Sequence, residues 1–430
     1  MSSDRDKKYS KETFLVHGLP HDGSWDFSYH VVPPITASTT FRLDSTLRGT
    51  QGFQAFAAPP GTDPAEKPIY IYDRLTEPTV ALLENQFKEI ELGESATAFA
   101  SGMSAISSLI LSLCSHGCRI VAHKTIYGCT YSLFTTWLPR LGIEVDFVDL
   151  TEDGALEAVL SDTTRAVFFE TPANPTLDII DIQRIADIVA KANENRSPDG
   201  EILTIVDNTF ATPYCQRPLK YGADFAVHSL TKNVMGFGTD MGGMVAGPAK
   251  YHSDVRMARK DFGGVVSPRA AWNILVYGIS SLPVRSDKQQ ANALEIARYL
   301  ESRPEVGRVL YPGLESHPHH EIARRQMRNF DDEFAPGIMV YFEIGGKGEA
   351  LFKRASKFID YIAKNSYTMT LAVSLGQMKT LIEAPALMTH CVYGDAAEDA
   401  GMSLGGVRLS LGVENPKDII QDLEAAFAVI

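Results

Sequence analysis

The chain has 430 residues, of which 44% are hydrophobic and 22% charged, with a formal net charge of -13. This composition is typical of a soluble globular protein with more than one core, and the acidic balance argues against nonspecific nucleic-acid binding. No apolar run approaches the length of a membrane span, and the charged N-terminus has no apolar segment behind it that would form a secretory signal.

The cysteines and histidines predict no metal site. Five cysteines at unpatterned spacings are expected to be free thiols in a reducing compartment, which favours a cytoplasmic protein. His317, His319 and His320 have a metal-like spacing, but histidines at a turn and a helix start explain it better.

Residues 1 to about 70 show little regular pattern and are rich in Pro, Gly, Thr and aromatic residues. A structureless segment of this length within a compact domain would be unusual. We therefore expect an extended arm that lies on another surface.

Two helices are predicted before residue 115. The first begins near Glu77, because Pro78 suits the first turn and the apolar residues after it recur at helical spacing. The second follows Ser101, Gly102 and Met103, where a glycine at a helix start lets backbone N–H groups approach a phosphate. An ordinary strand-to-helix turn is the alternative.

Short apolar runs then alternate with helical patterns, as in a parallel α/β sheet. The runs lie at residues 120–122, 145–150, 166–176, 202–206 and 225–227, with an amphipathic helix at 181–195. Asp207 follows one run, and Lys232 comes shortly after another. Ligand-contacting groups collect at the carboxyl ends of parallel strands, so these two side chains should project towards one crevice.

A carboxylate and a lysine at one crevice suit pyridoxal 5'-phosphate (PLP). This cofactor is held through a Schiff base to a lysine, and a carboxylate opposite its pyridine nitrogen keeps the ring able to accept electrons. Ser229 and Thr231 would offer hydroxyls to its phosphate. Taken alone, Asp207 is more often a turn cap and Lys232 a surface residue.

The surrounding motifs resemble the cysteine and methionine metabolism family of PLP enzymes. The family's succession of VDNTF, PL, GAD and HSxTK is found here at residues 206–210, 218–219, 222–224 and 228–232. The resemblance runs from about residue 13 to 427. It implies fold type I, the aspartate aminotransferase-like α/β fold with a mainly parallel central sheet. It further implies an arm at 1–70 that contacts a neighbouring subunit, a large PLP-binding domain at 71–268 and a smaller C-terminal α/β domain at 269–430.

The resemblance also implies roles for individual residues. Lys232 would hold PLP and move protons, Asp207 would face the ring nitrogen, and Tyr127 would stack on the ring and exchange protons with the substrate's amine or leaving group. The other expected cofactor contacts are Ser101, Gly102, Met103, Asn174, Ser229 and Thr231, together with Tyr72 and Arg74 acting on the partner subunit's cofactor. The expected substrate contacts are Arg408 (for the α-carboxylate), Ser374, Asn174, Cys129, Glu77, Lys260, Asp261 and Val373. The resemblance further implies a homotetramer, a dimer of dimers, with active sites shared across each dimer interface.

Three features favour the methionine γ-lyase branch of this family. Cys129 stands where most relatives have Gly, Lys260 and Asp261 form the pair found in that branch, and Val373 stands where cystathionine-cleaving relatives often have Glu. The expected reaction is γ-elimination from a methionine- or homocysteine-like amino acid, through a vinylglycine-type intermediate.

Other functions remain open at this stage. Glu77 replaces a family Asn, so a carboxylate near the pocket could select a cationic substituent such as that of canavanine, or it could simply favour the helix dipole. A γ-synthase or O-acylhomoserine sulfhydrylase would use the same residues. Tyr277 replaces a family Arg, without a consequence that follows from the sequence. A non-catalytic protein that retains the fold is disfavoured, because Lys232, Asp207, Tyr127 and Arg408 are all present.

Overall fold

The structure is a computed structural model that describes residues 9–18, 30–58, 68–346, 348–389, 393 and 401–430. Its helices are α1 (Lys11–His17), α2 (Thr46–Ala57), α3 (Pro78–Glu91), α4 (Gly102–Leu113), α5 (Gly128–Ser132), α6 (Ile182–Asn193), α7 (Thr212–Cys215), α8 (His252–Phe262), α9 (Pro268–Asn273), α10 (Ser280–Glu301), α11 (His320–Gln326), α12 (Gly348–Asn365) and α13 (Pro416–Phe427). Its strands are β1 (Ser95–Phe99), β2 (Arg119–His123), β3 (Glu144–Val148), β4 (Thr164–Glu170), β5 (Leu203–Asp207), β6 (Phe225–Ser229), β7 (Gly243–Gly247), β8 (Val306–Leu310), β9 (Met339–Ile344), β10 (Met369–Leu371), β11 (Thr380–Glu383) and β12 (Gly406–Ser410).

The first sheet has seven strands in the order β1-β7-β6-β5-β4-β2-β3. β7 runs antiparallel to both of its neighbours, and the pairs β2·β3, β2·β4, β4·β5 and β5·β6 are parallel. The central strands are buried on both faces, as their continuous apolar sequences require. The mainly parallel central sheet predicted from the sequence is therefore confirmed.

Three neighbouring strands of this sheet end in polar residues at the same edge. β4 ends at Glu170, β5 at Asp207 and β6 at Ser229. Glu170 and Asp207 are paired in the register of β4 and β5, so the two carboxyl groups stand side by side. This edge is where ligands bind in open α/β sheets.

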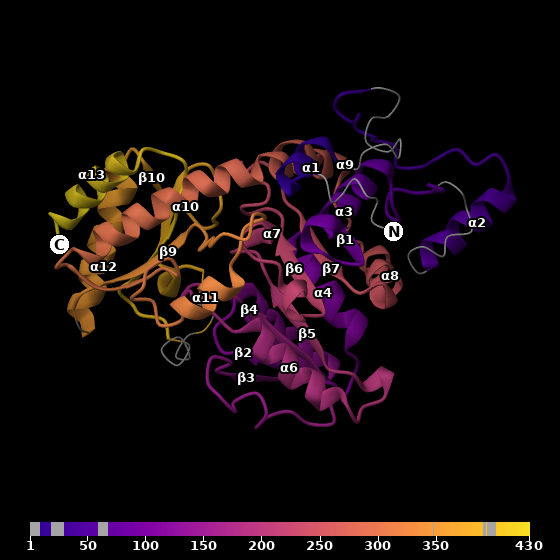
Figure 1. Cartoon of the computed structure of the whole chain (residues 1–430), viewed down its shortest axis with the longest axis horizontal. Helices are drawn as coiled ribbons and strands as arrows, with labels where there is room; N and C mark the ends of the chain where they lie inside the picture. The colour runs from indigo at the N-terminus through magenta and orange to yellow at the C-terminus, as the bar shows by residue number, and fades with distance from the viewer. Residues whose placement is uncertain (1–8, 19–29, 59–67, 347, 390–392, 394–400) are drawn as a thin grey trace.

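A nearly continuous helical stretch joins the first sheet to the rest of the chain. The long helix predicted near Pro268 is present as α9, a π-helical turn at Ile274–Ile279, and α10. Figure 1 shows α10 running from the centre of the molecule to the C-terminal part. Tyr277 lies in the π-helical turn, half exposed, and packs edge-on against Trp272.

The second sheet has five strands in the order β10-β11-β12-β9-β8 and a core of its own. Phe342 from β9 packs with Phe358 from α12 and Phe427 from α13, and side chains of α10 complete this core. Two sheets with separate cores agree with a division into a large and a small domain, and the boundaries at residues 70 and 268 stay a prediction.

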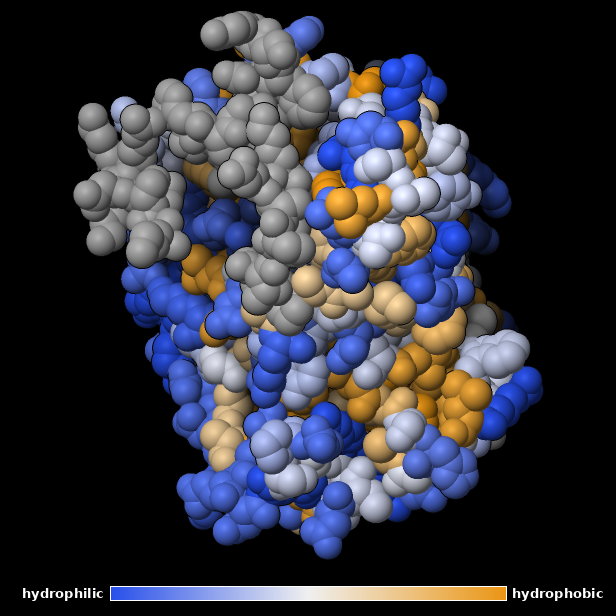
Figure 2. All heavy atoms as spheres, turned by 90° about the vertical axis from the view of Figure 1, so that its right-hand side faces the viewer, coloured by the Kyte–Doolittle hydropathy of each residue, from blue (hydrophilic) through white to orange (hydrophobic). Residues whose placement is uncertain are grey.

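The N-terminal region is more regular than its sequence suggested. α1 and α2 lie within residues 1–70, and Ser10 and Ser45 cap their first turns. α2 lies at the right-hand edge of Figure 1 and exposes Leu47 and Phe53. Figure 2 looks at this side of the molecule and shows apolar residues at the surface among polar ones.

Within the described ranges no helix is both long and apolar enough to cross a bilayer.

Candidate active site

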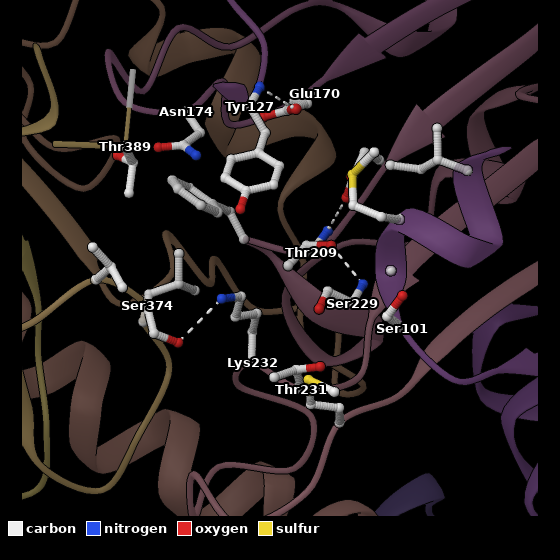
Figure 3. Close-up of a pocket in the computed structure, with 18 of the residues that line it drawn as sticks. Ser101, Tyr127, Glu170, Asn174, Thr209, Ser229, Thr231, Lys232, Ser374 and Thr389 are labelled. Atoms are coloured by element: carbon white, nitrogen blue, oxygen red, sulfur yellow. Dashed lines mark hydrogen bonds between the residues drawn. The ribbon is translucent and has the colours of Figure 1, made fainter. Parts of the chain in front are cut away.

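A cavity of about 260 Å³ lies at the carboxyl edge of the first sheet and is closed on its other side by the second sheet. Asp207, Ser229 and Lys232 line it from the first sheet, and Ser374 and Arg408 line it from the second. Figure 3 shows Ser101, Ser229 and Thr231 at one end and Asn174, Ser374 and Thr389 at the other, with Lys232 and Tyr127 between them.

The end of the cavity that holds the hydroxyls of Ser101, Ser229 and Thr231 has the features of a phosphate site. Ser101 is the N-cap of α4, a helix of 12 residues whose first N–H groups face the cavity with the positive end of the helix dipole. A Cβ on Gly102 would lie 2.8 Å from the Cβ of Ser229, so only glycine lets the helix start come this close to β6. The hydroxyls of Ser229, the last residue of β6, and of Thr231, two residues later, lie at the same end of the cavity.

Lys232 projects into the middle of the cavity. Its amine donates a hydrogen bond of 3.1 Å to the hydroxyl of Ser374, which lies in the loop before β11. Burial, and secondly the charge of Arg408, lower the pKa of Lys232. A lysine with a lowered pKa has more of the neutral, nucleophilic amine that Schiff-base chemistry requires.

Asp207 faces the same space from the end of β5. The backbone N–H of Thr209 donates a 3.0 Å hydrogen bond to one carboxylate oxygen. Burial raises the pKa of Asp207, against the effect of these contacts with Thr209. A cationic group beside the carboxylate would offset that burial cost.

Tyr127 is held from two sides. Its backbone N–H donates to Glu170 at 2.6 Å, and its phenol oxygen accepts a 3.3 Å hydrogen bond from the thiol of Cys129. Burial, and secondly the Cys129 contact, raise the pKa of Tyr127. The phenol therefore keeps its proton at neutral pH.

Arg408 forms the far end of the cavity and is almost fully buried. It donates to the side-chain oxygen of Asn174 at 2.7 Å and to the backbone carbonyl of Ser374 at 3.1 Å, and it pairs with Glu383 at 3.0 Å. A guanidinium held in this way can receive a carboxylate through two parallel hydrogen bonds. Ser374 itself has φ +109°, a strained value for a non-glycine residue, and such strain is found where surrounding contacts fix a functional geometry.

The donor set fits PLP on these observations. The helix start without a side chain at Gly102 suits a phosphate, the Asp207 carboxylate suits a protonated ring nitrogen, and the amine of Lys232 lies between them.

Comparisons with known proteins lead to the same family. The family model of the Cys/Met metabolism PLP-dependent enzymes matches residues 12–428. The chain belongs to this family. It is 40% identical over 422 residues to the L-methionine gamma-lyase of Fusobacterium nucleatum subsp. polymorphum, covering 97% of this chain and 98% of that protein. It is 38% identical over 359 residues to the cystathionine beta-lyase of Lactococcus lactis subsp. cremoris, covering 83% of this chain and 88% of that protein.

A solved structure shows the same architecture. The crystal structure of cystathionine gamma-lyase from Lactobacillus plantarum complexed with L-serine superposes with a TM-score of 0.83 at 32% identity, covering 98% of this chain and 99% of that chain. The fold-type-I expectation is confirmed, and the cofactor of this family member is PLP.

Most of the predicted site residues lie together in the cavity of this PLP enzyme. Those that line it are Ser101, Gly102, Met103, Tyr127, Asn174, Asp207, Ser229, Thr231, Lys232, Val373, Ser374 and Arg408. Cys129 does not line the cavity, but its thiol donates a hydrogen bond to the phenol oxygen of Tyr127, which does line it. Their roles towards cofactor and substrate stay predictions.

Four predicted residues form a separate cluster outside this cavity. Arg74 donates to the backbone carbonyl of Lys260 at 2.9 Å and stacks over the ring of Tyr72, and Lys260 pairs with Asp261 at 3.0 Å. Tyr72 is 39% exposed. This Tyr72–Asp261 cluster does not line the cavity of its own chain.

Glu77 also lies outside the cavity, and its geometry speaks against the substrate contact considered from the sequence. It is the N-cap of α3, fully buried, and its two carboxylate oxygens accept the N–H groups of Thr79 at 2.9 Å and Val80 at 2.6 Å. Of the two interpretations left open by the sequence, the helix-start carboxylate is the one that this geometry supports.

Several lining residues were missed by the sequence reasoning: Ile106, Glu170, Pro172, Thr209, Phe210, Met241, Leu375 and Thr389. Glu170 could have been found, because it is the first polar residue after the apolar residues 166–169 of the run predicted at 166–176. Glu383, which pairs with Arg408 behind the cavity, has no comparable signal in its local sequence.

The histidine and cysteine side chains that the structure describes form no metal site. In the described part of the chain no three His, Cys, Asp or Glu side chains gather in a way that could hold a metal ion. His317 and His320 each have a ring nitrogen within hydrogen-bond distance of a backbone carbonyl. Cys391 lies outside the described residues, and the other four cysteines are free.

Proposed function

We propose that this protein is a PLP-dependent γ-lyase that cleaves the Cγ–heteroatom bond of methionine- or homocysteine-like amino acids. The observation that carries the proposal is the Tyr127 phenol, hydrogen-bonded to Cys129, in the same cavity as Lys232 and Arg408. The relatives named L-methionine gamma-lyase, at up to 41% identity, support it.

Each group in the cavity has a distinct task in such a reaction. Arg408 and Asn174 receive the α-carboxylate of the substrate and thereby fix its orientation. The amine of Lys232 removes and returns protons at Cα and Cβ, and Tyr127 donates a proton to the leaving sulfur. PLP, when bound, supplies the electron sink that makes these protons acidic. The products are 2-oxobutanoate, ammonia and a thiol.

The lining also suits an uncharged substituent. Val373 is 58% exposed and Met241 is 64% exposed, so the solvent-facing part of the lining includes two apolar side chains. An apolar surface of this kind accommodates a methylthio group without leaving a polar group unpaired.

We further propose a homotetramer, a dimer of dimers, in the cytoplasm. The Tyr72–Asp261 cluster lies outside its own cavity and so is free to complete the site of a neighbouring subunit. The exposed Leu47 and Phe53 of α2 would be buried against such a neighbour. The four described cysteines are unpaired, which suits a reducing compartment.

The first test is product analysis by NMR. The cofactor-loaded enzyme is incubated separately with methionine, homocysteine, cystathionine, O-acetylhomoserine and canavanine, with and without an added thiol. We expect 2-oxobutanoate and a thiol from methionine or homocysteine alone. Turnover that begins only when the thiol is added would replace this proposal with a γ-synthase or sulfhydrylase.

The second test compares the wild type with the Glu77→Asn variant. Burial raises the pKa of Glu77 to about 7 in the folded state, whereas the pKa in the unfolded chain is near its ordinary value of 4.5. Between these two pH values the folded state therefore binds a proton that the unfolded state has already released. Stability relative to the Asn variant should therefore fall as pH rises from about 4.5 through 7. Thermal unfolding of both proteins across this range measures it, and methionine turnover should be unchanged, since Asn is also a good N-cap. If the wild type cleaves canavanine and Glu77→Asn loses that activity alone, the capping interpretation is wrong.

A further inference from the structure

Glu170 is a buried carboxyl group in the cavity that the proposed reaction does not use. It ends β4, is 5% exposed and lines the cavity. Its partner in the sheet register is Asp207, so two acidic side chains enter one small space from adjacent strands.

Glu170 accepts hydrogen bonds from the main chain of Tyr127, the residue that carries the phenol, and of Asn174. Its Oε1 accepts the backbone N–H of Tyr127 at 2.6 Å, a short bond visible in Figure 3. Tyr127 immediately precedes α5 and has no side-chain capping contact of its own. The Glu170 carboxyl therefore holds the main chain of Tyr127, next to Ile126, whose N–H and carbonyl are both bonded to the Tyr393 hydroxyl.

The charged groups around Glu170 do not favour a second negative charge. Burial, and then the Asp207 carboxylate, raise the pKa of Glu170 well above its ordinary value. The hydrogen bonds from the backbone N–H groups of Tyr127 and Asn174, and then the charge of Arg408, act in the opposite direction without cancelling this rise, and Arg408 is also paired with Glu383 at 3.0 Å. Tyr127 and Tyr393, the other titratable groups near it, are themselves held neutral by burial.

We propose that Glu170 is a positioning residue of the cofactor site: as an uncharged carboxylic acid it holds the main chain of Tyr127, and with it the phenol, in place, and leaves Asp207 as the single negative charge opposite the ring nitrogen. The role of Tyr127 in this inference rests on the proposed function. A carboxylic acid keeps a carbonyl oxygen that accepts the Tyr127 N–H.

Two variants separate the role of Glu170 as a hydrogen-bond acceptor from the effect of its charge. Glu170→Gln keeps the shape and the acceptor oxygen and cannot ionise. Glu170→Leu keeps most of the volume and removes the acceptor, which leaves the Tyr127 N–H unpaired. We expect Glu170→Gln to match the wild type in cofactor affinity, in the visible absorption and circular dichroism of bound PLP, and in kcat at pH 7 to 8. We expect Glu170→Leu to bind PLP with weakened visible dichroism and to lose about 10–100-fold in kcat, with KM little changed.

The outcomes that overturn the inference are specific. If the absorption band of bound PLP, or the midpoint of its pH titration, shifts in Glu170→Gln at neutral pH, the Glu170 carboxyl of the wild type is charged. If Glu170→Leu keeps the dichroism and kcat of the wild type, Glu170 positions nothing. If Glu170→Leu does not fold, infrared spectroscopy decides: a carboxylic-acid C=O band present in the wild type and missing from Glu170→Gln supports the inference, and its absence from the wild type overturns it. The dichroism readout does not depend on substrate, so a dichroism difference in an enzyme that ignores methionine would support this role while overturning the proposed function.

Discussion

Replacing Lys232 with alanine is expected to lower turnover of methionine by about 10⁴-fold or more, the upper range for a general acid–base group. The amine lies in the middle of the cavity, is held by the Ser374 hydroxyl at 3.1 Å, and has a pKa lowered by burial. Alanine removes both the covalent attachment of PLP and the group that moves protons at Cα and Cβ. Stopped-flow assays of the purified variant, with its visible spectrum, measure the loss.

The matched control for this experiment is Lys250→Ala. Lys250 is exposed and pairs with Glu201 at 2.6 Å on the surface, so its loss should leave turnover and the visible spectrum unchanged. A Lys232→Ala enzyme that still cleaves methionine at the wild-type rate would contradict the assignment of the catalytic lysine.

Replacing Arg408 with methionine is expected to lower kcat/KM on the order of 10²–10³-fold, because a hydrogen-bonded charge contact of this kind is worth about 2–5 kcal/mol. The same variant should be less stable, since it leaves Glu383 buried at 1% exposure without its cation. Steady-state kinetics and thermal unfolding measure the two effects separately.

A double variant distinguishes binding from stability. Adding Glu383→Gln to Arg408→Met removes the unpaired charge and still lets residue 383 accept the 2.7 Å hydrogen bond from Thr389. The double variant should recover stability and remain as poor a catalyst as Arg408→Met. If it also recovers kcat/KM, Arg408 supports the fold and does not bind the substrate carboxylate.

The elements that carry the cofactor site were accessible from the sequence because strand ends and helix starts leave local signals. The apolar run before Asp207 and the run before Ser229 place both residues at the same edge of the sheet, where the structure has them. Ser101 and Gly102 likewise mark a helix start by residue type alone.

The remaining features depend on distant pairings that no local pattern encodes. The proximity of Glu170 to Asp207 follows from the β4–β5 register, and the pairing of Arg408 with Glu383 from the β11–β12 register. The sequence showed that Glu77 was unusual, but the direction of its side chain depends on which N–H groups are nearest after folding. α2 was missed because its sequence has few of the apolar residues that produce a clear helical period.

The two ends of the cavity rest on different hydrophobic cores. The end with the Ser101 and Ser229 hydroxyls is built on the first sheet and α4, whereas Arg408 comes from β12 of the second sheet and Val373 and Ser374 from the loop that joins β10 to β11. We therefore expect that changes at Val373 can alter which amino acid is accepted without disturbing the packing of the first sheet and α4. This makes the loop before β11 a place to redesign the enzyme for a new amino acid.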